Sequence, residues 1–265
     1  MTGCYYRRLG REGDEQSFES TDLTRSNWDP AIQHGSPPLA LLVKAIEELS
    51  AATGQRIGRV TLDILGAIPV EEVGVRVWVD RPGKRIATYV AEMRVRQAGA
   101  VVRPVARVTA WLLASSDTAD VATDRYPPLA EGPAADLPPM FDDLTGYLQT
   151  IDWRRQLTQS GEPSVFWVSP TARVVDAEPD TSLVKLAAVV DSCNGIGAVL
   201  DYRRFTFMNT DTVVHLHRLP VGDDFGLRAR GSVGPDGVGV TSAEIFDRDG
   251  FIGVCAQTVL IQRRP

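Results

Sequence analysis

The stretch Ser36-Pro-Pro-Leu-Ala-Leu-Leu-Val-Lys-Ala-Ile-Glu-Glu-Leu-Ser50 carries the clearest helix signal in the chain. Its apolar residues recur every three or four positions and form one stripe, which predicts a helix with one buried face. Ser36 suits the N-cap, Pro37 suits the first helical position, and Gly54 suits the turn that stops a helix. We therefore expect one long helix that begins near Ser36 and lies across a sheet.

The residues after this helix alternate with the period of two that marks a half-buried strand. The alternation runs through residues 75–80 and 89–96, and a further strand is expected over residues 101–113. Residues 81–84 and 97–99 have the composition of hairpin turns. The first half of the chain is thus expected to be one long helix against a meander of antiparallel strands.

The second half of the chain repeats this order. An apolar stretch from Leu183 to Leu200, preceded by residues that suit a helix cap, predicts a second helix. Strands are expected over residues 205–218, 225–233, 238–246 and 251–263. Pro69, Gly83 and Gly99 each have a residue of the same type 151 positions later, at Pro220, Gly234 and Gly250. The constant offset and the shared order predict an internal duplication.

A polar, proline-rich segment separates the two halves. We expect an N-terminal unit over residues 1–118, a linker over residues 119–147 and a C-terminal unit over residues 148–265. One helix cannot cover both faces of its sheet, so the two units are expected to pair and bury what remains. The predicted fold class is α+β.

The composition excludes several function classes. The 265 residues carry a formal net charge of −6, with 43% hydrophobic and 23% charged residues, as is ordinary for a soluble globular protein. The acidic excess repels polyanions and argues against nucleic acid as a partner. No apolar run reaches the roughly 18 residues of a membrane span, and the three cysteines form no CxxC motif. We expect a cytoplasmic protein with no membrane partner.

Four segments combine uncommon residues in one order: Gln33-His-Gly-Ser-Pro-Pro-Leu-Ala-Leu-Leu42, Asp191-Ser-Cys-Asn-Gly195, Phe207-Met-Asn-Thr-Asp-Thr-Val-Val-His-Leu-His-Arg218 and Ala256-Gln-Thr258. These segments resemble the acyl-CoA thioesterase II-like (TesB-like) family, and similarity in order and spacing covers nearly the whole chain. The resemblance implies a double hotdog. In that fold two tandem hotdog halves, each a long helix wrapped by an antiparallel sheet, form one continuous sheet.

The resemblance also implies a reaction: hydrolysis of acyl-CoA or acyl-carrier thioesters to acid and thiol, with no covalent intermediate and no cofactor. In the family an aspartate, a hydroxyl residue and a late-strand glutamine hold the attacking water. The aspartate carries over to Asp191 and the glutamine to Gln257, whereas the hydroxyl position falls on Asn209, with Thr210 beside it. Alternation along a strand lets at most one of Asn209 and Thr210 face the site without a bulge. Family precedent further implies a homo-oligomer, a dimer or higher.

The residues themselves leave alternatives open. Asp191 lies in an apolar stretch, where burial makes a carboxylate a better base, but it could also simply end a helix before a turn at Gly195. Gln257 within an apolar strand needs hydrogen-bond partners, either Asp191 and a water or backbone groups. The Gly35 amide beside His34 could hold a thioester oxygen, although a glycine there also fits a simple turn. His34, Gly35 and Gly195 are the expected substrate-binding residues.

Two other functions compete with hydrolysis. The spacing of Asp29 and His34 matches the D-x4-H motif of hotdog hydratases, which act on enoyl thioesters. The second alternative is a non-catalytic hotdog protein that binds an acyl chain or serves as a cyclase-like chaperone. His215 and His217 form an H-x-H pair without an evident third ligand, so no metal site is expected. Candidate residues for CoA phosphates are Arg81, Lys84, Arg85, Arg103 and Arg107.

Overall fold

The computed structural model describes residues 3–96, 102–124, 126–142 and 144–264, and strands dominate it. The strands are β1 (Cys4–Glu12), β2 (Glu15–Ser20), β3 (Gln55–Ile64), β4 (Glu72–Arg81), β5 (Ile86–Arg96), β6 (Val102–Ala114), β7 (Ile151–Arg155), β8 (Ser164–Pro170), β9 (Arg173–Val175), β10 (Phe205–Asn209), β11 (Asp211–Leu216), β12 (Phe225–Val233), β13 (Val238–Asp247) and β14 (Gly250–Arg263). The α-helices are α1 (Ser36–Ser50), α2 (Ser182–Val190) and α3 (Cys193–Ile196), with short 3-10 turns at Asp22–Thr24, Ala119–Val121, Pro139–Phe141 and Gly146–Thr150.

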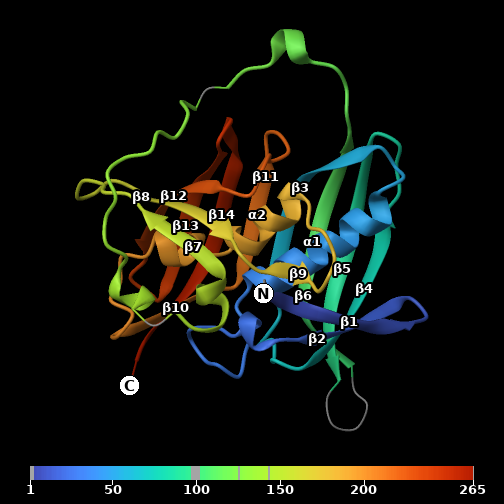
Figure 1. Cartoon of the computed structure of the whole chain (residues 1–265), viewed down its shortest axis with the longest axis horizontal. Coiled ribbons are helices and arrows are strands. Elements are labelled where there is room, and N and C mark those ends of the chain that lie inside the picture. The colour runs from blue at the N-terminus through green and yellow to red at the C-terminus, as the bar shows by residue number, and fades with distance from the viewer. Residues whose placement is uncertain (1–2, 97–101, 125, 143, 265) are drawn as a thin grey trace.

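One continuous sheet of 14 strands runs through both halves (Figure 1). Its order is β7-β8-β12-β13-β14-β11-β3-β6-β5-β4-β2-β1-β9, and β10 pairs with β14 beside this path. Strands β11 and β3 join the halves by antiparallel pairing. On either side of that pair, β14-β13-β12 mirrors β6-β5-β4, so both halves connect their strands in the same order. The predicted single sheet is confirmed, and this symmetry is the one expected of a duplication.

The hairpins explain the constant sequence offset. Gly83 lies between β4 and β5, and Gly234 lies between the equivalent strands β12 and β13. Gly250 opens β14, whereas the turn expected at residues 97–99 lies outside the described residues. The sequence pattern predicted neither the N-terminal hairpin of β1 and β2 nor the strands β3, β7, β8 and β9. In β1 most side chains are exposed, so no apolar alternation marks this strand.

Helix α1 forms where it is predicted, but its first turn differs from the expectation. Gly35 takes the N-cap position and Ser36 is the first helical residue, so Ser36 does not cap the helix. Every residue from Ser36 to Ile46 is buried, because α1 contacts β4, β5 and β6 as well as α2. Even Lys44 is buried, and its ammonium donates to the Pro179 carbonyl at 2.7 Å. Burial on several sides replaces the expected single apolar stripe.

The expected long second helix, over residues 183–200, is not continuous. Helix α2 ends at Val190, Asp191 is its C-cap, and the four-residue helix α3 follows. Gly197 then lies so close to β12 that an added Cβ would stand 3.1 Å from the backbone of Arg230 and Gly231. Helix α3 ends at Ile196 because the backbone of Gly197 packs directly on the sheet. The description of each half as one long helix is therefore wrong for the second half.

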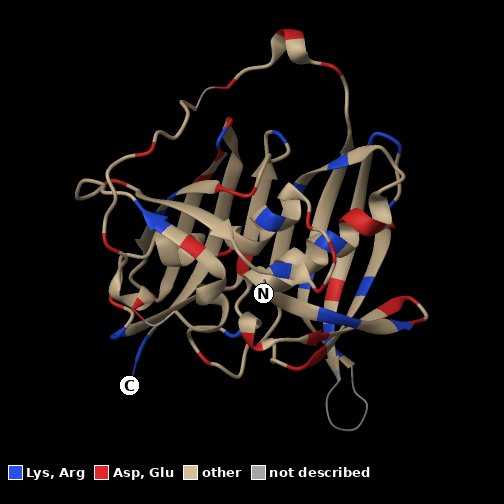
Figure 2. Ribbon diagram, in the orientation of Figure 1, with Lys and Arg blue, Asp and Glu red and all other residues tan. Residues whose placement is uncertain are grey.

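The segment predicted as a linker has two parts. Its first part, in green, runs over the top of the molecule in Figure 1, whereas its last part enters the core. Phe141 is 6% exposed and Tyr147 is fully buried. Charged residues of both signs are scattered over strands and loops, and the end of β14 at the C-terminus is basic (Figure 2). No helix in the described ranges is long and apolar enough to cross a membrane.

Candidate active site

A buried carboxylate lies where the end of α2 meets the start of α1. Asp191 is 2% exposed and occupies the break between α2 and α3. The N-terminal turn of α1 lies against it, because an added Cβ on Gly35 would stand 2.5 Å from Asp191 Oδ2. The first half of the chain thus supplies one wall around a carboxylate that belongs to the second half.

One oxygen of this carboxylate is held by the strands beneath it. Asp191 Oδ1 accepts from Asn209 Nδ2 at 2.7 Å and from the Thr212 hydroxyl at 2.6 Å. Gln257 Nε2 donates to the Asp191 carbonyl at 2.9 Å and approaches Oδ1 at 3.4 Å. Three expected residues, Asp191, Asn209 and Gln257, therefore lie in direct contact. These donors fix the side chain in one orientation.

Thr212 is the residue that the sequence analysis missed. Its hydroxyl accepts from Asn209 Nδ2 at 3.1 Å and from Gln257 Nε2 at 2.9 Å, so its single proton is left for Asp191 Oδ1. Thr210, in contrast, donates to Asp211 Oδ1 at 3.2 Å and does not join the cluster. The strand expected over residues 205–218 is interrupted at Thr210, and this break places both Asn209 and Thr212 beside Asp191.

The second oxygen of the carboxylate faces the start of α1. Within the described part of the chain, no hydrogen bond reaches Asp191 Oδ2, and His34 Nδ1 lies 3.7 Å away. His34 Nδ1 accepts the Ser36 N–H at 3.1 Å, so the imidazole is neutral with its proton on Nε2. Burial lowers the pKa of His34, and the nearby Asp191 opposes that shift only in part. The imidazole is further fixed by stacking on Tyr147, with ring centroids 4.0 Å apart.

Two cavities meet at Asp191. The larger measures about 270 Å³ and is bounded by the segments 26–35 and 64–68 and by β10. The smaller measures about 40 Å³ and lies between α3 and the buried end of the linker, where Gly195 and Met140 form part of its wall. Asp191, Asn209, His34 and Trp28 line both cavities. Gln257 and Thr212 line neither, so they stand behind the carboxylate rather than in the cavity.

Two family profiles match this sequence. Residues 24–113 match the acyl-CoA thioesterase N-terminal domain, and residues 124–261 match the acyl-CoA thioesterase C-terminal domain. The second profile alone covers more than half of the chain. This chain belongs to the acyl-CoA thioesterase family. It is therefore a thioester hydrolase, as its resemblance to TesB-like proteins predicted.

Solved structures of other proteins share the fold of this thioesterase over nearly its whole length. A conserved protein of unknown function with a hot dog fold from Alicyclobacillus acidocaldarius superposes with a TM-score of 0.73 at 14% identity, over 97% of this chain and 96% of that chain. The tesB protein of Mycobacterium avium subspecies paratuberculosis gives a TM-score of 0.67 at 16% identity, over 97% and 96%. Acyl-CoA thioesterase II TesB2 from Mycobacterium marinum gives 0.65 at 15% identity, over 98% and 96%.

At such identities these likenesses establish the fold alone. No curated protein matches the sequence of the thioesterase significantly. The match of fold extends through both halves of the chain, which agrees with the mirrored strand order of the sheet.

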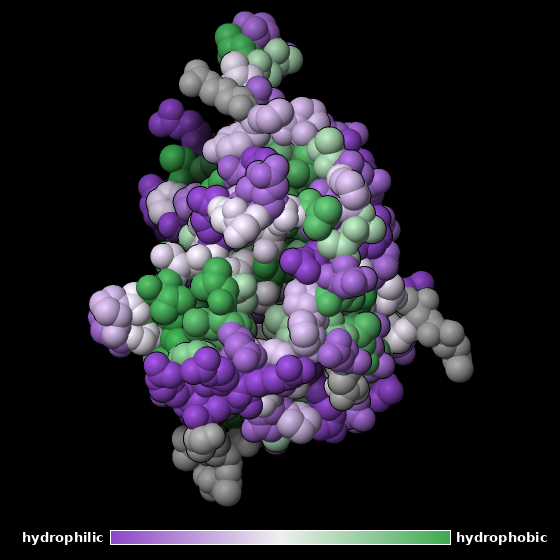
Figure 3. All heavy atoms as spheres, turned by 90° about the vertical axis from the view of Figure 1, so that its left-hand side faces the viewer, coloured by the Kyte–Doolittle hydropathy of each residue, from purple (hydrophilic) through white to green (hydrophobic). Residues whose placement is uncertain are grey.

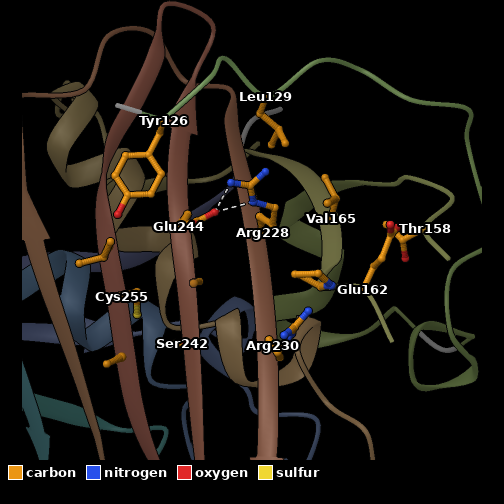
Figure 4. Close-up of a pocket in the computed structure, with 14 residues that line it drawn as sticks. Tyr126, Leu129, Thr158, Glu162, Val165, Arg228, Arg230, Ser242, Glu244 and Cys255 are labelled. Carbon is orange, nitrogen blue, oxygen red and sulfur yellow. Dashed lines mark hydrogen bonds and ion pairs between the residues drawn. The ribbon is translucent and has the colours of Figure 1, made fainter. Parts of the chain in front are cut away.

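A further cavity of the thioesterase lies apart from Asp191. It measures about 790 Å³ and lies on the outer side of β12, β13 and β14, beneath Tyr126 and Leu129 of the linker (Figure 4). Arg228 and Glu244 form an ion pair within it. Apolar side chains gather on the face of the molecule that Figure 3 shows. On β13, Val238 and Val240 are exposed. The cavity contains no buried carboxylate comparable to Asp191, so we do not place the reaction there.

Three of the residues that favoured other functions, Asp29, His215 and His217, line neither cavity beside Asp191. Asp29 is exposed and caps a local turn by accepting the Ala31 N–H at 2.8 Å, so it does not reach the cavity with His34. His215 is exposed, and His217 packs 5.7 Å from the Phe251 ring. Across the described ranges, His, Cys, Asp and Glu side chains form no group of three suited to a metal.

Proposed function

We propose that the thioesterase hydrolyses acyl-CoA thioesters with a water activated by Asp191. The observation that carries this proposal is the different treatment of the two carboxylate oxygens. Oδ1 is held by Asn209 and Thr212, whereas Oδ2 accepts no hydrogen bond from the described residues and lies beside Gly35 and His34, which line the cavity. A carboxylate fixed in this way can accept a proton from a water without first reorganising.

The proposed reaction then proceeds in two steps, addition of water and loss of the thiolate. Asp191 Oδ2 takes one proton from the water while the water oxygen bonds to the thioester carbonyl carbon, and the carbonyl electrons move to its oxygen. The tetrahedral oxyanion collapses, the carbon–sulfur bond breaks, and the thiolate takes the proton from Asp191. The products are a free acid and a thiol, with no bond formed between enzyme and acyl group.

The Gly35 amide is the proposed donor to the oxyanion. Of the N–H groups at the start of α1, that of Ser36 is bound by His34, and Pro37 and Pro38 have none. The Gly35 N–H has no partner among the described residues and lies beside Asp191. Because glycine leaves no side chain in the way, a thioester oxygen can reach this amide.

The remaining residues position these groups. Gln257 and Thr212 orient Asp191 from behind, and Asn209 does so from the cavity wall, where its carbonyl oxygen can accept the second proton of the water. His34 and Gly195 line the substrate cavities. The apolar larger cavity, with Ile32, Ile64 and Ile68, suits the part of the substrate next to the thioester.

The division into units over residues 1–118, 119–147 and 148–265 remains our proposal, with one refinement. Tyr147 at the end of the linker packs on His34, so the linker contributes to the site as well as joining the units.

A panel of substrates tests the proposed function. Purified protein is incubated with saturated acyl-CoAs of several lengths, and free thiol is measured with a thiol reagent. Thiol release with one equivalent of free acid supports hydrolysis. Hydration of an enoyl-CoA without thiol release would support hydratase chemistry instead, and binding without turnover on any substrate would support a non-catalytic acyl-binding protein.

A further inference from the structure

Three arginines lie together where β10 begins and β14 ends. Arg204 precedes β10, Arg263 is the last residue of β14, and Arg264 follows it. Residue Phe205 pairs with Arg263 across the two strands, and the Arg264 N–H donates to the Arg204 carbonyl at 2.9 Å. The antiparallel pairing of β10 with β14 therefore brings Arg204 beside Arg263 and Arg264, which lie about 60 residues later in the sequence.

Aromatic rings, rather than carboxylates, hold these arginines. The guanidinium of Arg263 lies 4.9 Å and that of Arg204 lies 5.9 Å from the centre of the Phe205 ring. The guanidinium of Arg264 lies 5.6 Å from the Trp28 ring. Within the described part of the chain none of the three forms an ion pair, although the protein carries a net charge of −6 and many of its other arginines are paired. Stacking leaves the N–H edges of a guanidinium free to bind an anion.

One arginine of the cluster, Arg264, stacks on a residue that lines the larger cavity beside Asp191. Trp28, under Arg264, lines that cavity. Elsewhere along the cavity, Arg103 Nη1 lies 2.7 Å from the position of a Cβ on Gly66, which also lines the cavity. The buried Nε of Arg103 has no hydrogen-bond partner among the described residues. Arg103 Nη2 donates to the Ala67 carbonyl at 3.4 Å. Among the described residues neither Arg103 nor Arg264 forms an ion pair, and both lie against residues that line the cavity.

The spacing along the strand matches the length of a thioester carrier. Phe205 lies four positions before Asn209, which holds Asp191, so at about 3.3 Å per residue its backbone stands about 13 Å from that of Asn209 along β10. About thirteen bonds separate the sulfur of a phosphopantetheine arm from its phosphorus, and an extended chain with three bonds per 3.5 Å spans about 15 Å over that number. A thioester carbon at Asp191 thus places the carrier phosphate near the arginines.

We propose that Arg204, Arg263 and Arg264, together with Arg103, bind the phosphates of the CoA part of the substrate. This inference rests on the proposed function, since it takes the thioester to be at Asp191. Arginine binds phosphate through parallel N–H donors, which a lysine point charge does not reproduce. Of the five basic residues proposed from the sequence, only Arg103 belongs to this site. Arg107 pairs with Glu92, and Arg81, Lys84 and Arg85 lie in the β4–β5 hairpin at the far end of the sheet.

The test compares the double variant Arg263→Gln/Arg264→Gln with wild-type protein on two substrates. An acyl-CoA carries all the phosphates, whereas the same acyl group on pantetheine carries none. We expect KM for acyl-CoA to rise at least about tenfold with kcat unchanged, and KM for acyl-pantetheine to stay within twofold. The matched control, Lys84→Gln/Arg85→Gln, removes the same charge from the hairpin and is expected to leave both KM values unchanged.

Direct binding separates this inference from the proposed function. Titration of CoA, which needs no turnover, is followed by calorimetry with the wild type and the double variant. Weaker CoA binding by the double variant, by at least about tenfold, supports the phosphate site even if no acyl-CoA is hydrolysed. Equal CoA affinity of the two proteins, or an equal rise of KM on acyl-pantetheine, overturns it. Loss of activity only on acyl-carrier-protein substrates would overturn it in favour of a protein carrier.

Discussion

The two carboxylate oxygens of Asp191 make different contacts. Oδ1 is held by Asn209 and Thr212, and Oδ2 lies beside Gly35 and His34. A hydrogen bond to a carboxylate contributes about 1.5–3 kcal/mol, so these donors are strong enough to hold the side chain in one orientation. The geometry of the base therefore depends on Thr212, which lines neither cavity, as well as on Asn209 in the cavity wall.

Removal of the Thr212 hydroxyl tests this dependence. In Thr212→Val, Asp191 Oδ1 loses its 2.6 Å donor, and Gln257 loses the acceptor at 2.9 Å. We expect kcat to fall about 10- to 100-fold with little change in KM, because the site keeps its shape while the base loses its orientation. Thr212→Ser is expected to restore most of kcat. Equal kcat for wild type and Thr212→Val in steady-state assays would contradict this role.

A methyl group at Gly35 tests the other oxygen. In Gly35→Ala the new Cβ would stand 2.5 Å from Asp191 Oδ2, so either the carboxylate or α1 must shift. We expect kcat to fall at least about tenfold and the free energy of unfolding to fall by about 1–3 kcal/mol, the usual cost of overpacking. Gly10→Ala is the control, because nothing lies within 4 Å of an added Cβ there. Wild-type kinetics for Gly35→Ala would show that the two groups are not in contact.

The sequence predicted most of this cluster and missed one member for a definable reason. Asp191, Gln257 and Asn209 meet as their spacing in the family motif implies, and His34 and Gly35 face them. Thr212 was missed because residues 205–218 read as one strand, in which Asn209 and Thr212 would point to opposite faces. The break at Thr210 is a long-range effect: its backbone bonds to Ile64 and Thr258 on two other strands.

At the scale of elements, period-two alternation identified the strands that are buried on one side only. It located β12, β13 and β14 within a residue or two of their ends, because each is flanked by a glycine turn. It did not identify β1 or β9, whose pairing with each other depends on chain segments about 170 residues apart. The break between α2 and α3 was also missed, because the apolar run continues through it, and the end of α3 was missed because it depends on the packing of Gly197 against β12.

The connection after β11 offers a test of element stability. The Asp247 carboxylate is buried, pairs with Arg218 and accepts the Val221 N–H at 2.9 Å, which ties that connection to β13. Burial acts to raise the pKa of Asp247, but the bonds from Arg218 and the backbone outweigh it, so the pKa is lowered. The resulting stability is therefore fully present above about pH 4 and is lost as pH falls through the lower folded-state pKa.

We expect Asp247→Asn to lower the free energy of unfolding by roughly 3 kcal/mol at pH 7, because Arg218 loses its buried partner. The variant should also lose less of its remaining stability than wild type between pH 4 and pH 2. Urea unfolding at several pH values measures both effects. Parallel pH profiles for the two proteins would contradict the assignment of this acid sensitivity to Asp247.

At the scale of the whole molecule, the site needs both halves. Gly35 and His34 come from the first half, and Asp191, Asn209 and Gln257 come from the second. The pairing of β11 with β3 and the contact of α1 with α2 hold the halves together. The double arrangement therefore builds one site around Asp191 rather than leaving each half self-sufficient.

Separation of the halves tests this requirement. Residues 1–118 and 119–265 are produced apart and then mixed, the second fragment retaining Tyr147 of the site. We expect neither fragment alone to hydrolyse acyl-CoA, and the mixture to recover activity, since the sheet joins the halves without the linker. Full-length protein cleaved at an inserted protease site after residue 120 serves as the control and should stay active. Activity of the isolated second fragment would contradict a shared site.

The most direct test of the whole account is the turnover of Asp191→Asn on acyl-CoA. The substitution keeps the shape of the side chain and its Oδ1 contacts but removes the base. Free thiol release is measured under saturating acyl-CoA, with Asp29→Asn as the control for an exposed aspartate. The account predicts a fall in kcat of at least about 100-fold for Asp191→Asn and wild-type kcat for Asp29→Asn. Hydrolysis by Asp191→Asn at the wild-type rate would contradict it.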